Sequence, residues 1–341
     1  MPEVNLKEKL AEISNQVEPV IERLLKSDVE PLNQEVAYHQ CQSGGKRIRP
    51  ALVVTCARVF GADSESVLEV AAATEILHNS TLIIDDIIDH SEFRRNEPTT
   101  WNKYGQSIAE CASFIYMASI FSALSRANNG QKISDLFGRT LKTIIDGEIL
   151  DILFERSGRD NEPFVVEHRY QNITTDDYFK MIGQKTAVLL ECCCKAGAYS
   201  ASVDDERADI IGDFGYNLGM AFQIRDDILD IFGDEKEFGK KIGKDIIEKK
   251  MGNFIILSAI EKLNSEDSRT ITDLLNGSAE VTDADVQMVT ELINKTDAKS
   301  SAEKLANDFI QKSYDDLSKL PQNEHTELLM EIAKYIVDRK V

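Results

Sequence analysis

The chain has 341 residues and a formal net charge of −20 at neutral pH. So large a negative charge argues against binding to nucleic acid, which needs a basic surface, and against binding to anionic membranes. The length allows two domains of ordinary size, and it also allows one large helical domain with a sizeable core.

The N-terminal segment and the cysteines indicate a soluble, cytoplasmic protein. The stretch from Met1 to Glu12 is charged throughout and lacks the apolar core of a signal peptide. No apolar run is expected to reach the length of a membrane span, so we predict no transmembrane segment. The six cysteines lack metal-type spacing, and we interpret the run 192–194 as small core side chains in a reducing compartment.

Helical patterns dominate the sequence. Only seven prolines occur, and no alternating run or Asn-Gly hairpin indicates a sheet. Apolar spacing predicts helices, in chain order, at 6–25, 29–40, 46–60, 64–90, 106–127, 131–156, 175–200, 204–233, 252–263, 267–275, 283–295, 298–318 and 323–338. The polar stretches 158–173 and 233–251 are predicted to be loops or irregular. No low-complexity linker separates two halves, so we predict a single all-α domain over residues 1–341.

A short acidic motif occurs twice, each time after an apolar helical run. Its two copies are Asp85, Asp86 and Asp89, and Asp226, Asp227 and Asp230. Residues four apart share one face of a helix, and clustered carboxylates repel one another unless a cation lies between them. Carboxylate oxygens suit Mg²⁺ that also binds substrate phosphates. Two such motifs facing each other would form a metal clamp for a diphosphate.

The stretch 43–50 joins two glycines to three cations, Lys46, Arg47 and Arg49. The glycines let backbone amides approach an anion, and the arginine fork suits phosphate oxygens. The alternative is a loop that leads into a helix with a basic first turn. Cations are unfavourable at a helix N-terminus unless an anion is bound there, so phosphate binding remains a candidate function of this stretch.

Arg94 and Arg95 directly follow the first acidic motif. Two adjacent arginines there could bind two different anions, or they could form ion pairs with Asp85, Asp86 or Glu92. His78 precedes Asp85 by about two helical turns and therefore projects near the same face. A lone histidine on a core helix is more often a packed residue, but its place beside the acids favours a diphosphate contact.

Further polar residues lie around the second motif. Lys185 could bind a leaving diphosphate, while Thr186 and Gln223 could turn oxygen atoms toward a developing positive charge. Ordinary helix polarity is the alternative. The segment after the motif is basic and includes Lys240 and Lys250, although such a run is usually a solvated surface.

The joint order of these features strongly resembles the trans-isoprenyl diphosphate synthases, or polyprenyl synthetases. The resemblance is dense over residues 40–255 and looser in the terminal helices. It implies an all-α bundle of long helices around a deep central cavity, usually as a homodimer. One departure is Asn96, where the family commonly has Gly; Asn tolerates the left-handed conformation that such a turn needs.

The resemblance also implies a role for each matching residue. A small cluster of Mg²⁺ ions would be bound by the six aspartates of the two motifs. Isopentenyl diphosphate would be bound by Lys46, Arg49, His78 and Arg95, with Arg47 in the same basic set. The allylic diphosphate would be bound by Arg94, Lys185, Lys240 and Lys250. Oxygens of Thr186 and Gln223 would face the carbocation. The residues expected to be catalytic are Asp85, Asp86, Asp89, Lys185, Thr186, Gln223 and Asp226.

The implied reaction is a head-to-tail, trans condensation of isopentenyl diphosphate with an allylic diphosphate. Ser80 and Thr81 lie about one turn before the first motif, where family members that stop at farnesyl length generally carry aromatic residues. Both side chains are small, so we predict a product of geranylgeranyl length or longer. A lower floor could be formed by Phe114, Tyr116, Met117 or Phe121.

Two other functions fit parts of the pattern. A class I terpene cyclase would share the helical cavity and the first acidic motif, but it would not need a second basic site. A non-catalytic subunit of a heteromeric synthase tends to lose one acidic motif, and both are present in this sequence.

Overall fold

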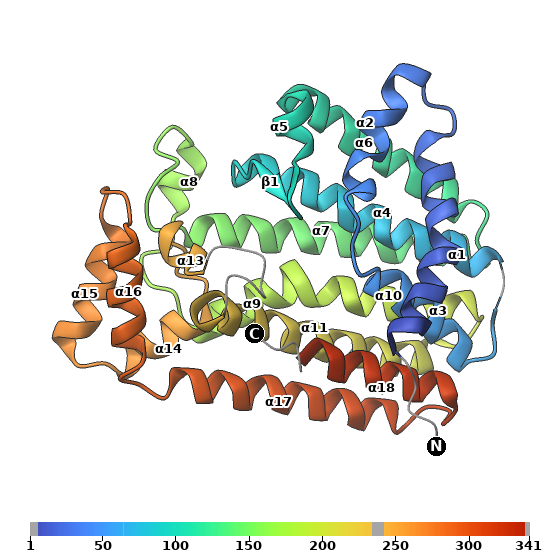
Figure 1. Cartoon of the computed structure of the whole chain (residues 1–341). Coiled ribbons are helices and arrows are strands. Elements are labelled where there is room, and N and C mark those ends of the chain that lie inside the picture. The colour runs from blue at the N-terminus through green and yellow to red at the C-terminus, as the bar shows by residue number, and fades with distance from the viewer. Residues whose placement is uncertain (1–5, 64, 234–241, 338–341) are drawn as a thin grey trace. The chain divides into compact units, whose positions relative to one another are not determined.

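A computed structural model describes residues 6–63, 65–233 and 242–337, and these residues confirm the all-α prediction (Figure 1). The α-helices are Leu6–Lys26 (α1), Gln34–Gln42 (α2), Ile48–Val59 (α3), Glu65–Ile88 (α4), Thr100–Tyr104 (α5), Gln106–Leu124 (α6), Gly130–Phe154 (α7), Pro163–His168 (α8), Thr175–Ile182 (α9), Val188–Ser200 (α10), Asp205–Phe232 (α11), Lys244–Ile247 (α13), Phe254–Lys262 (α14), Ser265–Asn276 (α15), Asp283–Ile293 (α16), Ala298–Leu317 (α17) and Glu324–Val337 (α18). A 3₁₀ turn, Pro31–Asn33 (η1), and a π-helix, Gly183–Ala187 (η2), complete the helical elements.

The chain divides into two compact units. The first consists of Met1–Arg139, Leu190–Gly215 and Tyr314–Ile332, and the second of Thr140–Leu189, Tyr216–Ser313 and Ala333–Val341. The single domain and the central cavity that the sequence suggested therefore stay predictions, and each unit is described by itself below.

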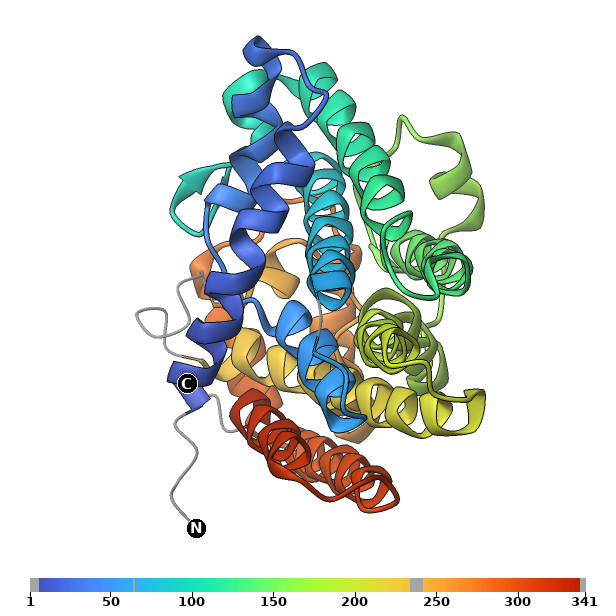
Figure 2. The same cartoon turned by 90° about the vertical axis from the view of Figure 1, so that its right-hand side faces the viewer.

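Helix α4 is the central element of the first unit. It contacts α1, α3 and α6, and Figures 1 and 2 show α1 running beside it. Helix α1 buries Ile13, Val17 and Ile21, which lie four residues apart on one face. In α4 the run from Val70 to Leu77 is buried throughout, because neighbouring helices cover it on several sides. The first acidic motif is thus carried by a helix that neighbouring helices largely enclose.

A two-residue hairpin follows α4, although the sequence analysis predicted no strands. Its strands, Phe93–Arg94 (β1) and Glu97–Pro98 (β2), pair antiparallel, with Phe93 opposite Pro98. The two residues between them, Arg95 and Asn96, have φ angles of 55° and 63°. Two left-handed residues in a two-residue loop match the right-handed twist of paired strands. The expectation that Asn96 would tolerate this conformation is confirmed.

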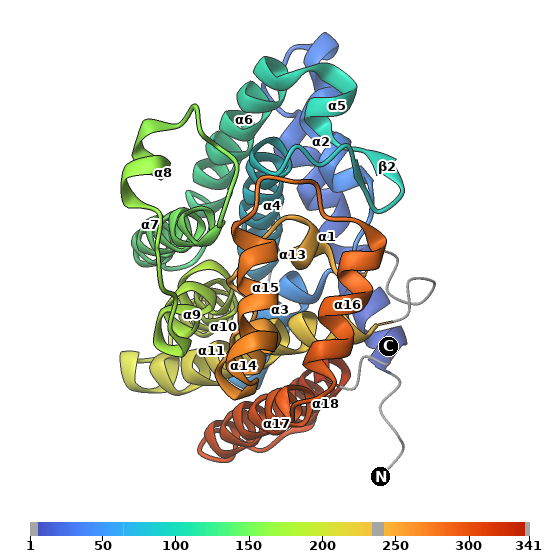
Figure 3. The same ribbon diagram turned by 90° about the vertical axis from the view of Figure 1, so that its left-hand side faces the viewer.

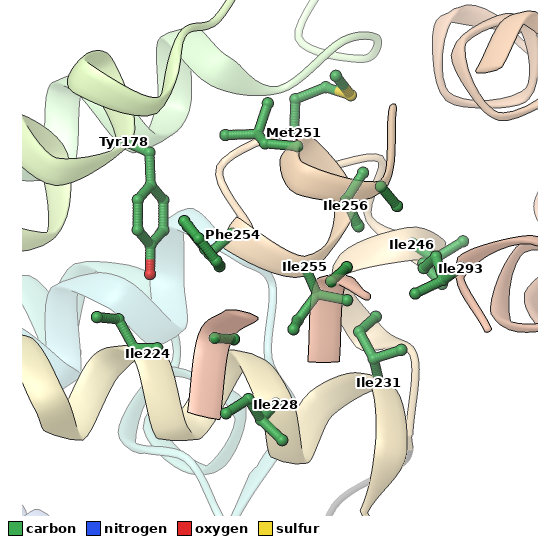
Figure 4. Close-up of a cluster of buried hydrophobic side chains, with 14 of the residues drawn as sticks. Tyr178, Ile224, Ile228, Ile231, Ile246, Met251, Phe254, Ile255, Ile256 and Ile293 are labelled. Carbon is green, nitrogen blue, oxygen red and sulfur yellow. The ribbon is translucent and has the colours of Figure 1, made fainter. Parts of the chain in front are cut away.

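The second unit has its own apolar core, which Figure 4 shows in close-up. The ring of Tyr178 on α9 lies beside that of Phe254 on α14, with centroids 5.7 Å apart. Ile224 and Ile228 on α11 extend the same core. Helices α15 and α16 each contact α14 (Figure 3). This core fixes α9, α11 and α14 relative to one another, and these helices border the second set of candidate residues.

The predicted helix 175–200 is interrupted by the π-helix η2. Glycines of two neighbouring helices allow its backbone to be approached closely: a Cβ on Gly147 of α7 would lie 2.4 Å from the backbone nitrogen of Lys185, and one on Gly219 of α11 would lie 2.5 Å from the Cα of Ala187. Both distances are too short for any side chain. Single-turn π-helices inside α-helices often mark functional positions, and this one contains Lys185 and Thr186.

Three further differences separate the predicted and observed elements. Helix α8 lies inside the predicted loop 158–173, α13 lies inside the predicted irregular segment 233–251, and α5 was not predicted at all. All three are six residues or shorter, and apolar periodicity cannot be read over so few positions.

Two helices, α4 and α6, are long and apolar enough to cross a membrane by length and composition. The expectation that no apolar run reaches that length is therefore wrong. Of the apolar window in α4, 72% is buried inside the protein, as in a core helix, compared with 44% in α6.

Candidate functional site

The first acidic motif lies at the C-terminal end of α4. The backbone N–H of Asp89 donates to the carbonyl of Asp85 at 2.8 Å, so these two residues share one helical face as predicted. Both are half-buried. Asp86 is 1% exposed, and its carboxylate accepts hydrogen bonds from the Arg94 Nε at 2.9 and 3.0 Å. The ion pair between Arg94 and Asp86, one of the alternatives for this arginine, is therefore present.

The basic stretch forms a loop that bends sharply before α3. Gly44, Gly45 and Arg47 all have positive φ angles, of 86°, 148° and 48°. Lys46 is exposed and Arg49 is half-buried. Arg47, in contrast, is 4% exposed. The two glycines supply backbone conformations that residues with a side chain rarely adopt, so the loop depends on them.

Arg95 joins this loop to the hairpin, because its Nη1 donates to the carbonyl oxygen of Gly44. His78 lies on α4 within the field of these cations. Burial, and after it the positive charges of Arg49 and Arg95, lower the pKa of His78 well below its usual value. The imidazole is therefore neutral at neutral pH, with one nitrogen as donor and one as acceptor. Every residue predicted to bind isopentenyl diphosphate thus belongs to the first unit.

The second acidic motif lies near the end of α11. Asp226 is half-buried, whereas Asp227 and Asp230 are 3% and 9% exposed. Asp227 accepts from the backbone N–H of Phe254 at 2.8 Å. Asp230 accepts from the backbone N–H groups of Lys244 and Asp245 at 3.1 and 3.2 Å. These two carboxylates anchor the segments that follow α11, a role that the sequence analysis missed.

Burial and the negative charge of Asp245 raise the pKa of Asp230 to about 8 and raise that of Asp227 as well. Acids that repel one another in this way are stabilised in their charged form by a bound cation. Carboxylate oxygens are the ligands that Mg²⁺ prefers, so the donor set fits this ion. Among residues 6–63, 65–233 and 242–337, however, no three His, Cys, Asp or Glu side chains are grouped so that they could hold a metal ion.

Thr186 and Gln223, predicted to act together, are in contact. The Thr186 hydroxyl donates to the Gln223 side-chain oxygen at 3.0 Å, and the Gln223 amide nitrogen donates to Asp227 at 3.1 Å. Asp227 in turn holds the first turn of α14 through Phe254. The π-helix η2, α11 and α14 are therefore connected by one line of hydrogen bonds.

Asp151 on α7 is a residue that the sequence analysis missed. Its carboxylate lies 2.6 Å from the ammonium of Lys185 and 3.9 Å from that of Lys250. Glu148, one turn earlier, lies 2.7 Å from the same Lys185 ammonium. The spacing of three residues between two acids in an apolar helix was the available signal.

The position of Lys250 depends on the turn that contains it. Lys249, the preceding residue, has a φ of 57° and is 8% exposed, and its ammonium donates to the carbonyl of Gly277 at 2.5 Å. Two neighbouring lysines of this basic segment therefore point to different partners. Lys240 lies outside the described residues.

A test of the Asp151 cluster follows from its pKa. Burial alone would raise the pKa of Asp151, but the charges of Lys185 and Lys250 outweigh burial and lower it from 3.8 to about 2. A pKa lowered by folding contributes stability above the unfolded pKa, and this contribution is lost as the pH falls through the folded pKa. Asp151→Asn should therefore lower the free energy of unfolding by on the order of 2 kcal/mol at pH 7.

This difference between the two proteins should shrink as the pH falls from about 4 to 2. Urea unfolding at a series of pH values measures it. Asp146→Asn, on the exposed side of the same helix, serves as the control and should have little effect. A difference that is independent of pH would contradict the assignment.

Comparisons with known proteins identify the family of the chain. Residues 30–293 match the polyprenyl synthetase family. The chain is 32% identical over 337 residues to the geranylgeranyl diphosphate synthase of Saccharolobus solfataricus, covering 96% of each protein. It is 32% identical over 324 residues to heptaprenyl diphosphate synthase component 2 of Bacillus subtilis, covering 95% of this chain and 87% of that protein.

Among solved structures, one similar fold is the polyprenyl synthase from Caulobacter crescentus, complexed with calcium and isoprenyl diphosphate. Its TM-score is 0.86, with 30% sequence identity and 98% of each chain covered. The family match spans well over half of the chain, and the relatives are similar over almost their whole length. The chain therefore belongs to the polyprenyl synthetase family and is a prenyltransferase.

Proposed function

We propose that this prenyltransferase condenses isopentenyl diphosphate with an allylic diphosphate, head to tail and trans, to give a product of geranylgeranyl length or longer. The names of the relatives support the reaction class. The observation that carries the proposal is the hydrogen bond between Thr186 and Gln223, next in sequence to Lys185, whose ammonium is paired with the buried Asp151. Ionisation of an allylic diphosphate requires a cation for the leaving group and oxygen atoms for the developing positive charge, and these residues supply both kinds of group.

In this proposal Lys185 and Lys250 bind the allylic diphosphate, with Arg94 and Lys240 as further ligands. Isopentenyl diphosphate is bound by Lys46, Arg49, His78 and Arg95. The chemistry of the members supports this division: Lys185 and Lys250 supply compact ammonium groups, whereas Arg49 and Arg95 supply guanidinium forks close to the neutral His78. Arg47 was predicted as a further ligand, but its burial does not favour a direct contact.

The six aspartates of the two motifs are the proposed Mg²⁺ ligands. When bound, several such ions would neutralise the diphosphate and turn it into a better leaving group. The raised pKa of Asp230 supports this role, because a carboxylate among other acids is short of positive charge.

The Thr186–Gln223 hydrogen bond determines which atoms can stabilise the carbocation. The Thr186 hydroxyl hydrogen is directed at Gln223, so the lone pairs of the Thr186 oxygen face elsewhere and can approach positive charge. Asp227 holds the Gln223 amide in one orientation. The isopentenyl double bond then attacks the cation, and the departing diphosphate takes the proton, so no side-chain base is needed. Water must be excluded, since it would quench the cation.

Two alternatives make different predictions. A class I terpene cyclase would not use isopentenyl diphosphate, and the basic loop with Arg95 argues against it. A subunit of a heteromeric synthase would need a second component, as the name of the Bacillus subtilis relative indicates for that protein.

We also propose a cytoplasmic location, in keeping with the negative net charge.

Activity of the purified chain alone tests the function. With Mg²⁺, labelled isopentenyl diphosphate and each of several allylic primers, we expect an extended product. Asp85→Asn should lower kcat by about 100-fold or more, because it removes a group that stabilises the leaving diphosphate. The control Asp135→Asn, an exposed position on α7, should keep wild-type activity. No extension with any primer would favour the cyclase or the subunit.

Product length tests the role of the residues before the first motif. Ser80 is 4% exposed and Thr81 is half-buried, and both hydroxyls bond to carbonyls one turn earlier in α4. Ser80→Phe combined with Thr81→Phe should shorten the product by at least one isoprene unit, since the larger rings fill space below the motif. Product sizing by chromatography measures this. Ser107→Phe, exposed on α6, is the control; an unchanged product from the double variant would refute the assignment.

We further propose that the chain forms a homodimer through α6. Phe114 and Phe121 lie seven residues apart on one face of this helix and are 73% and 70% exposed, an exposure of large apolar side chains that soluble monomers rarely present. Phe114 and Phe121 are thus poor candidates for a cavity floor within the first unit, whereas Tyr116 is fully buried.

A second copy of the chain would cover this face. Phe114→Glu with Phe121→Glu should convert the dimer to a monomer in sedimentation equilibrium, because charge cannot be buried unpaired. Phe164→Glu, at a phenylalanine 59% exposed on α8, is the matched control and should remain a dimer. A wild-type chain that sediments as a monomer contradicts the proposal.

A further inference from the structure

Arg47 differs from the other cations of the basic loop in that its charge is already matched inside the protein. Its side chain is 2% exposed. The Nε donates to Glu18 on α1 at 2.5 Å, and one Nη donates to Glu75 on α4 at 2.8 Å. Two buried or half-buried carboxylates thus surround a single guanidinium, which leaves it little capacity for a further anion.

The same guanidinium also holds the backbone of the loop. It donates to the carbonyl oxygen of Cys41 at 2.7 Å and to that of Gly44 at 3.3 Å. These carbonyls belong to the segment directly before Lys46. One planar group therefore fixes the loop to α1 and to α4 at the same time.

The backbone of Arg47 supports this interpretation. Its φ of 48° lies in the left-handed region, which residues with a Cβ adopt only when the surroundings enforce it. Asn79 secures the acid partner, because its amide donates to the Glu75 carboxylate at 3.1 Å. The strained residue and its network are thus determined by the same buried contacts.

Arg95 depends on the same loop. Its Nη1 donates to the Gly44 carbonyl, the oxygen that Arg47 also contacts. A Cβ on Gly45 would lie 2.9 Å from Arg95 Nη1 and 3.2 Å from Arg47 Nη1, so both guanidinium groups lie against this glycine. A movement of Arg47 would therefore also displace Arg95.

We propose that Arg47, with Glu18 and Glu75, is a positioning group for the isopentenyl diphosphate site and does not itself bind the substrate. It holds the Gly44–Gly45 backbone so that Lys46, Arg49 and Arg95 converge on one diphosphate. The inference rests on the proposed function and replaces the direct role that the sequence suggested for Arg47.

The two carboxylates allow the positioning role to be separated from direct binding. If Arg47 bound the diphosphate, then Glu18→Gln and Glu75→Gln would release its charge toward the substrate and lower the KM for isopentenyl diphosphate. If Arg47 positions the loop, both changes loosen it. The KM for isopentenyl diphosphate should then rise by about tenfold, while the KM for the allylic diphosphate stays within about twofold.

Arg47→Lys completes the set, since lysine keeps the charge but cannot reach four acceptors from one plane. It should raise the same KM at least as much as either glutamine variant. Arg58→Lys, on helix α3, which directly follows Arg47, is the matched control; Arg58 is paired with the exposed Asp63, and its replacement should change neither KM. Thermal unfolding checks that each variant is folded. Glu18 is the most exposed member of the network, so if the other variants do not fold, the KM of Glu18→Gln decides between positioning and direct binding.

The outcomes separate the two claims. A wild-type chain that is inactive with every primer refutes the proposed function. An active wild type with an unchanged or lower isopentenyl diphosphate KM in Glu18→Gln and Glu75→Gln overturns the positioning role. An equal rise of both KM values in these variants would show a general loss of structure and would also overturn it.

Discussion

The structure depends on the pairing of carboxylates that are buried in apolar helices. A chain with a net charge of −20 places acids in the interior of both units, and several of these acids are paired with cations. Asp86 is matched by Arg94, Glu75 by Arg47, and Asp151 by two lysines. An unpaired buried charge would cost several kcal/mol. The cations that balance these acids are therefore fixed in place, and many of them are the residues expected to meet a diphosphate.

The sequence predicted the helices well because most are long and amphipathic. Helix α1 was expected at 6–25 and is found at Leu6–Lys26, and α17 was expected at 298–318 and is found at Ala298–Leu317. The short helices were not predicted, since four to six residues are too few to show a helical period. The hairpin β1–β2 was missed for another reason: its turn is made by Arg95 and Asn96, without the glycine that usually signals such a loop.

Candidate residues were found where they stand next to each other in the sequence, and their partners were missed where the contact is made between distant segments. Lys185 and Thr186 were recognised as a pair, but Asp151, which lies on α7, was not. Glu18 and Glu75 are likewise remote from Arg47 in the chain. The charge of Arg47 was visible in the sequence. Its burial, which does not favour a direct contact with substrate, is a property of the packed helices. The motif thus identified Arg47 as a candidate residue, whereas its two acidic partners are visible only in the packed structure.

The π-helix η2 shifts the helical phase within the segment 175–200, which the sequence pattern treats as one continuous helix. A π turn accommodates one more residue than an α turn, and one residue corresponds to about 100° of rotation. The side chains that directly follow η2, Val188 and Leu189, are therefore turned by roughly that angle from where the pattern of α9 would put them. Loss of one residue within 183–187 would leave a regular α-helix, but it would turn either Lys185 or Leu189 away from its present neighbours. Related sequences should therefore carry no deletion within these five positions, even where they carry deletions in other helices.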